Sequence, residues 1–151
     1  MGFSLIGLLI TSVILLPNLL VLLRPPINAP KTVRSAGVLM TVLERAGQMA
    51  CFVLPVFSRR YIEAAGVNAW FILAALCIAV YDGLWLRYAI RRDYVLLFSP
   101  LFHIPIPMAV FPVLAFAFIA IWIGSIWLGI AALALAVGHL ANSWAAYKST
   151  V

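Results

Sequence analysis

The chain has 151 residues, of which 66% are hydrophobic and only 9% are charged. Soluble domains are about 45–50% apolar and about 25% charged, and a domain of this size still exposes much of its surface. The composition therefore excludes an ordinary soluble fold and predicts an all-α, polytopic integral membrane protein of the cell (inner) membrane. The net charge of +6 does not indicate nucleic-acid binding, because the basic residues are scattered through the predicted membrane loops.

Five stretches are long and apolar enough to form the roughly 20-residue helix that crosses a bilayer. Polar or proline-rich segments end the first three, namely Arg24-Pro25-Pro26, Ser58-Arg59-Arg60 and Arg91-Arg92-Asp93. We therefore expect one transmembrane domain over residues 1–151, a five-helix bundle. Its predicted spans cover residues 2–23, 35–57, 67–90, 106–123 and 125–147.

The fourth span is expected to be irregular. Residues 94–123 are apolar throughout but are interrupted by Pro100, Pro105, Pro107 and Pro112. A proline inside a helix removes a hydrogen-bond donor and clashes with the preceding turn. We predict a non-helical segment over residues 102–107, with 94–102 interfacial or re-entrant and 106–123 crossing the membrane. A single kinked and tilted helix is the alternative.

The loop charges predict the orientation. Lysine and arginine gather in short cytoplasmic loops. In a five-span arrangement one end carries seven of these residues and the other carries two, Arg59 and Arg60. The N-terminus is therefore expected outside and the C-terminus in the cytoplasm. The seven on the predicted cytoplasmic side are Arg24, Lys31, Arg34, Arg87, Arg91, Arg92 and Lys148.

Polar residues inside the spans concentrate in the predicted cytoplasmic half. Charged residues within membrane spans are rare, and they usually face the bundle interior or a water-filled cavity. The helical spacing predicts that Thr41, Glu44, Arg45 and Gln48 share one face. The outer halves of the spans are almost purely apolar, which indicates a polar pocket that is open to the cytoplasm or inner leaflet. The candidate ligand-binding residues are Glu44, Arg45, Gln48, Asp82, Trp85, His139 and Asn142.

Arg45 and Asp82 are expected to form an ion pair within this pocket. With a rise of 1.5 Å per residue, both lie roughly 12–15 Å from the predicted cytoplasmic helix ends. Glu44 is a competing partner for Arg45, although adjacent residues on a helix diverge by about 100°. A structural role is the alternative for each, because buried ion pairs and interhelical hydrogen bonds also set helix packing.

Three classes of function remain open. The first is binding or processing of a small amphipathic or anionic ligand, with Arg45 holding a phosphate or carboxylate. The second is a small transporter or proton-coupled carrier that works as a homo-oligomer, and the third is an accessory membrane subunit. No nucleophile motif or phosphate-binding loop is present, so an enzymatic activity is not established.

Cofactor chemistry receives no support from the sequence. Cys51 and Cys77 lie inside apolar stretches and do not form a CxxC pair, the arrangement expected of a thiol–disulfide oxidoreductase. The two cysteines and the two histidines have unrelated spacing, which does not predict a zinc site. The lipid bilayer is the one partner that the composition indicates directly.

Overall fold

The computed structural model describes residues 2–30 and 32–149 of the chain. Lys31, one of the seven basic residues assigned to the cytoplasmic side, lies outside the described residues. The described part is all-helical and contains no β-strand, with two isolated β-bridges. Four of its helical segments are long and apolar enough to cross a membrane: residues 5–23, 38–56, 69–91 and 126–148. A shorter apolar helix covers residues 107–122.

The first helical segment changes its pitch at a proline. Helix α1 covers Leu5–Leu15, the 3-10 turn η1 covers Leu16–Leu19, and α2 covers Leu20–Leu23. Pro17 lies in η1 and has no N–H to continue the α-helical ladder. The Asn18 side chain donates a hydrogen bond of 3.1 Å to the Ile14 carbonyl beside this interruption. Asn18 is thus a polar side chain that is hydrogen-bonded within a helical segment of membrane-spanning length.

The other long helices begin and end at recognisable residues. Helix α3, Val38–Val56, follows Gly37, whose φ of 114° few other residues adopt. In α5, Ala69–Arg91, Asn68 caps the N-terminus by accepting from Trp70 and Phe71. In α7, Ile126–Lys148, Ser125 accepts from the Leu128 N–H. These helix bounds lie within three residues of the corresponding predicted spans.

The segment before α6 is irregular. The 3-10 turn η2 covers Tyr94–Leu97, and residues 98–106 form turns with an isolated bridge between Leu101 and Ile104. Phe102 and Ile106 have φ values of 53° and 46°, in the left-handed region that costs non-glycine residues energy. Helix α6, Pro107–Trp122, begins at the proline, where a missing N–H costs nothing. Residues 102–106 are thus non-helical, whereas Pro107 is helical.

One short helix was not predicted. Residues Arg59–Ala65 form α4, whereas the sequence indicated a loop after the second span. Glu63 accepts a hydrogen bond of 2.7 Å from Arg59 one turn earlier, and this contact raises the pKa of the Arg59 guanidinium. The φ of Gly66 is 60°, and this left-handed residue ends the helix.

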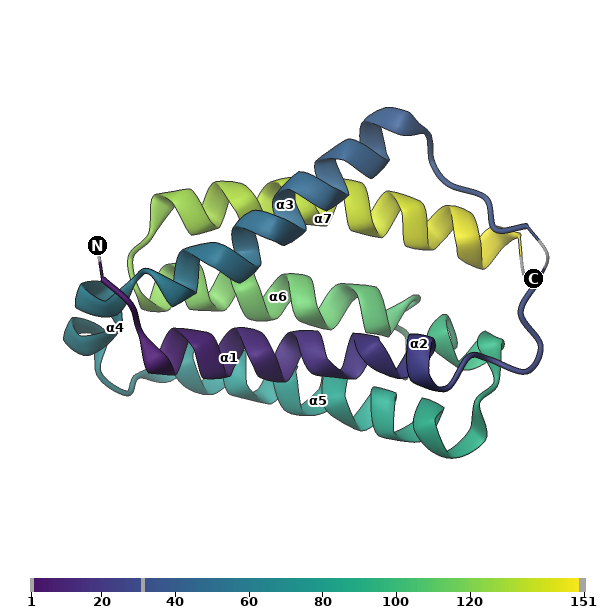
Figure 1. Ribbon diagram of the computed structural model, residues 1–151, viewed down its shortest axis with the longest axis horizontal. Coiled ribbons are helices and arrows are strands. Elements are labelled where there is room, and N and C mark those ends of the chain that lie inside the picture. Colours follow the sequence, from purple (N-terminus) through teal and green to yellow (C-terminus); the bar gives the residue numbers. More distant parts are fainter. Residues whose placement is uncertain (1, 31, 150–151) are drawn as a thin grey trace.

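The helices form a bundle in which α3 lies across the others (Figure 1). Helix α6 packs between α5 and α7, α3 packs mainly on α7, and α1 packs on both α3 and α5. The N-terminus and α4 lie at one end of the long axis, and the C-terminus lies at the other (Figure 1). Large buried side chains fill the space between the helices, including Tyr88, Phe116, Ile119 and Leu128.

Two glycines bring the backbones of α3 and α7 into contact. A Cβ atom on Gly138 of α7 would lie 2.3 Å from the Glu44 nitrogen and 2.5 Å from the Met40 carbonyl oxygen of α3. A Cβ on Gly47 would lie 2.4 Å from the Leu135 nitrogen of α7. Real Cβ atoms do not approach backbone atoms so closely. Only glycine at these positions allows this helix crossing.

Candidate functional site

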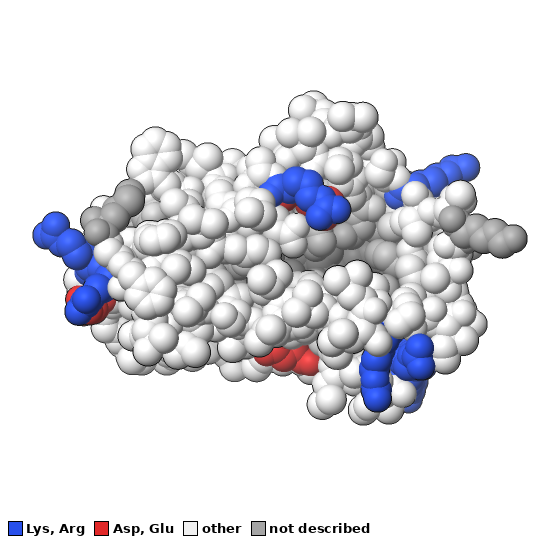
Figure 2. Space-filling view, in the orientation of Figure 1, with Lys and Arg blue, Asp and Glu red and all other residues white. Residues whose placement is uncertain are grey.

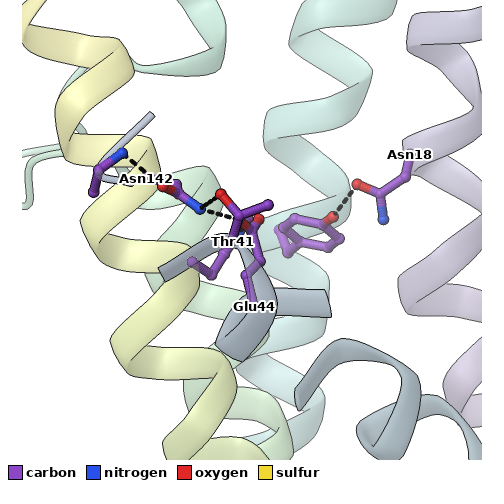
Figure 3. A network of polar contacts seen from close by, with 7 residues as sticks. Asn18, Thr41, Glu44 and Asn142 are labelled. Atoms are coloured by element: carbon purple, nitrogen blue, oxygen red, sulfur yellow. Dashed lines mark hydrogen bonds and ion pairs between the residues drawn. The ribbon is translucent and has the colours of Figure 1, made fainter. Parts of the chain in front are cut away.

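A cluster of polar side chains lies where α3 crosses α7 (Figure 3). Glu44 of α3 places its Oε1 atom 2.7 Å from Nδ1 of His139 on α7. Its other oxygen, Oε2, accepts a hydrogen bond of 2.6 Å from the Asn142 side chain. Asn142 also lies 3.5 Å from the Thr41 hydroxyl. The crossing thus connects a carboxylate, an imidazole, an amide and a hydroxyl.

The backbone contact explains why these side chains meet. Glu44 follows Thr41 by one turn, and His139 is adjacent to Gly138. Because Gly138 lies against the backbone of Glu44, the flanking side chains are held close together. The side chains of His139 and Glu44 remain 29% and 21% exposed. The cluster is therefore partly accessible from outside the bundle.

Asn142 also ties the loop before α3 to α7. Its Oδ1 atom accepts a hydrogen bond of 2.8 Å from the Ala36 N–H, while its Nδ2 atom donates to Glu44. The amide oxygen therefore bonds to the loop before α3, and the amide nitrogen bonds to α3 itself. Both segments lie about 100 residues earlier in the chain. This side chain fixes the position of Glu44 and of the start of α3 together.

Arg45 and Gln48 lie on the same face of α3 as Phe52. These residues and Phe52 occupy positions i, i+3 and i+7, which share one helix face. Phe52 packs edge-on against Phe116 of α6, with ring centroids 5.8 Å apart. Towards its N-terminus α3 runs obliquely away from α6 (Figure 1). Arg45 is exposed and Gln48 is half-buried.

The molecular surface is hollowed in the same region. In Figure 2 a basic group, with an acidic group behind it, lies over the middle of α3 beside a hollow. Most of the remaining face is uncharged, and the other basic groups gather at the two ends (Figure 2).

Trp85 belongs to a separate set of contacts around α5. Its ring lies between those of Tyr81 and Tyr88, with centroid distances of 6.2 and 5.5 Å and near-perpendicular planes. The Tyr81 hydroxyl donates a hydrogen bond of 3.0 Å to Asn18 of η1 (Figure 3). The Tyr88 hydroxyl donates to the Arg24 carbonyl. These residues connect the first helical segment to α5.

The expected ion pair between Arg45 and Asp82 does not form. Among the described residues, the carboxylate oxygen Oδ1 of Asp82 is buried without a hydrogen-bond partner. The pair fails because α3 packs chiefly on α7, whereas α5 packs on α6, so similar depths in the membrane do not bring the two side chains together. The structure therefore brings together Glu44, His139 and Asn142, and it separates Asp82 and Trp85 from them.

Three further residues, Thr41, Asn18 and Tyr81, make contacts that were not predicted. Thr41 and Asn18 were visible as polar residues within spans, but their partners depend on helix order. Tyr81 was expected to share a face with Asp82 and Trp85, and a tyrosine in an apolar segment often finds a partner for its hydroxyl, but the sequence did not identify Asn18 as that partner. No group of three histidine, cysteine, aspartate or glutamate side chains within the described residues is arranged to hold a metal ion.

Comparison with known proteins identifies no relative of this chain. No family model, curated protein or solved structure matches the chain.

Replacement of Asn142 tests the cluster. Asn142→Ala leaves the Ala36 N–H without its partner and removes one donor from Glu44, so the free energy of unfolding should fall by about 1–3 kcal/mol. The measurement is reversible unfolding in mixed micelles. Ser143→Ala is the matched control, since it removes a neighbouring polar group outside the cluster. An equal effect of both substitutions would contradict the assigned contacts.

Proposed function

We propose that the chain is a five-span membrane protein in which α6 is the fourth span. Helix α6 has 16 residues, about 24 Å at 1.5 Å per residue, and is shorter than the usual crossing. It packs along both α5 and α7, which are long enough to span a membrane. Its N-terminal end follows the irregular residues 98–106, and non-helical backbone is tolerated at membrane depth only against protein or water.

The orientation follows from the charges at the two ends. Arg59 and Arg60 of α4 lie at the same end as the N-terminus (Figure 1). The loops at the other end contain the larger group of basic residues. Under the positive-inside rule this second end is cytoplasmic and α4 is outside. The Glu44 cluster then lies in the cytoplasmic half, since Glu44 follows the first residue of α3 by about 9 Å.

The function that the geometry supports best is the binding of a small anionic amphipathic molecule in this half. The observation that carries this proposal is the position of exposed Arg45 and half-buried Gln48 on the face of α3 that Phe52 extends towards Phe116 of α6, next to the Glu44–His139–Asn142 cluster. A guanidinium offers several donors in a planar fork that matches a phosphate or carboxylate. Both oxygens of the Glu44 carboxylate already contact His139 and Asn142. The Arg45 guanidinium therefore stays available to pair with a ligand anion.

The apolar surroundings favour an amphipathic ligand over a free ion. The outer half of the bundle contributes aromatic and aliphatic side chains, including the buried Phe116 and the partly buried Phe52. An alkyl chain placed there would be shielded from water, and its acidic head would remain at the level of Arg45. Ligand sites in proteins commonly combine mostly apolar walls with a few placed polar groups.

A proton-coupled carrier is the second candidate. The 2.7 Å contact between His139 and Glu44 favours it, because a carboxylate and an imidazole can share and release a proton. Proton uptake into liposomes that accompanies movement of an anionic amphiphile, and that is lost in Glu44→Gln, would favour this function over binding alone.

Labelling of single cysteines tests the orientation. Cys51 and Cys77 are both buried and are first replaced by alanine. An impermeant thiol reagent added to intact cells should then label Glu63→Cys, whereas Ser149→Cys should react only after the cells are permeabilised. The reverse pattern, or labelling of both positions from outside, would contradict the proposed arrangement.

Binding of an alkyl phosphate tests the ligand class. In nanodiscs of neutral phosphatidylcholine, radiolabelled dodecyl phosphate should bind saturably. Arg45→Gln should weaken this binding about tenfold or more, because loss of one charged hydrogen-bond donor costs about 1.5–3 kcal/mol. Arg60→Gln provides the control, since it removes the same charge at the opposite end. Equal binding by Arg45→Gln and the unaltered protein would exclude the proposed head-group site.

A further inference from the structure

The carboxylate of Asp82 lies at a groove outside the α3–α7 crossing that holds the Glu44 cluster. The groove has a volume of about 360 Å³ and is bounded by α1, α5 and α6. Asp82 is the only charged residue among those that line it. It lies about 13 Å from the C-terminal end of α5, well inside the predicted membrane span. The feature is a single acid within an apolar groove.

Small side chains create this groove. Ala75, Ala79 and Asp82 follow one another at spacings of four and three residues, so they share one face of α5. The two alanines leave space between α5 and α1, where Leu9 and Val13 are exposed. Ile119 and Trp122 of α6 complete the lining. The groove is therefore open along the exposed side of α1 and α5, and an elongated apolar body fits its shape.

Asp82 lacks the partners that membrane carboxylates usually have. Its Oδ1 atom is buried without a hydrogen bond, and Arg45 lies on another helix that does not reach it. An ionised carboxylate at this depth requires a positive charge or a hydrogen-bond donor nearby. Within the described residues the groove provides neither, since its other lining side chains are apolar or, for Trp122, already donate to the Gly66 carbonyl.

We propose that this groove binds an amphiphilic amine, whose ammonium group pairs with Asp82 while its apolar body lies between α1 and α5. A protonated primary amine provides both the positive charge and the N–H donors that the unpartnered oxygen lacks. The aromatic pair Phe71 and Trp122, with ring centroids 4.9 Å apart, lies at the far end of the groove from Asp82 and would contact the apolar body. The proposal is independent of the anionic site at Arg45, because the two charged residues are of opposite sign and lie on different helices, Arg45 on α3 and Asp82 on α5.

Binding of dodecylamine to the full chain tests the proposal. The protein is placed in nanodiscs of neutral phosphatidylcholine, and binding of radiolabelled dodecylamine is measured after subtraction of empty nanodiscs. We expect saturable binding of one molecule per chain, at least tenfold tighter than that of dodecanol. Asp82→Asn should weaken amine binding at least tenfold and should leave the weaker dodecanol binding unchanged.

Two further variants separate the groove from general charge effects. Ala79→Leu fills the groove and retains the carboxylate, so it should also weaken dodecylamine binding. Asp93→Asn makes the same substitution as Asp82→Asn in the loop after α5, and it should leave binding unchanged. Unaltered binding in Asp82→Asn, equal affinity for amine and alcohol, or equal loss in Asp93→Asn would overturn the proposal. Each variant is first shown to retain the melting temperature and elution volume of the unaltered protein.

Discussion

The contact between the backbones of α3 and α7 is the constraint on which the rest of the structure depends. Gly47 and Gly138 lie on opposite helices, and each occupies a position where a Cβ atom would overlap the partner's backbone. In a bilayer, lipid chains are as apolar as the helix surfaces, so close packing and interhelical hydrogen bonds hold helices together. The glycines permit the close packing directly, and they also place Glu44, His139 and Asn142 within hydrogen-bonding distance.

The same crossing determines where a ligand could enter. Because α3 meets α7 at an angle, its N-terminal half diverges from α6 (Figure 1), whereas Phe52 nearer the other end still packs on Phe116. Arg45 and Gln48 lie along the diverging part. A parallel arrangement of α3 would bury Arg45 against an apolar helix at a cost of several kcal/mol. The crossing angle therefore leaves this charge accessible from one side of the bundle.

Hydropathy and the flanking proline and basic residues were sufficient to locate the four long helices, because a membrane-crossing helix needs an apolar run of defined length and the runs end at segments such as Arg24-Pro25-Pro26 and Arg91-Arg92-Asp93. The order of the helices around the bundle could not be predicted in this way. Arg45 and Asp82 have similar depths, yet they lie on helices that pack on different neighbours, so their expected pairing was wrong. The depth of a residue in the membrane follows from its position along its own helix. Its interaction partner depends on how helices that are distant in sequence pack together. The polarity of the Glu44 and His139 positions was evident, but their contact required the glycine crossing.

Alanine substitution at glycine tests the crossing most directly. Gly138→Ala inserts a methyl group against the backbone of Glu44, whereas Gly83→Ala on α5 places the same group where nothing lies within 4 Å. In reversible unfolding in mixed micelles, Gly138→Ala should lower the free energy of unfolding by about 1–3 kcal/mol, as overpacking of a close contact does. Gly83→Ala should leave it unchanged or raise it by up to about 1 kcal/mol through higher helix propensity. Equal stability of the two variants would show that α3 and α7 do not meet at Gly138.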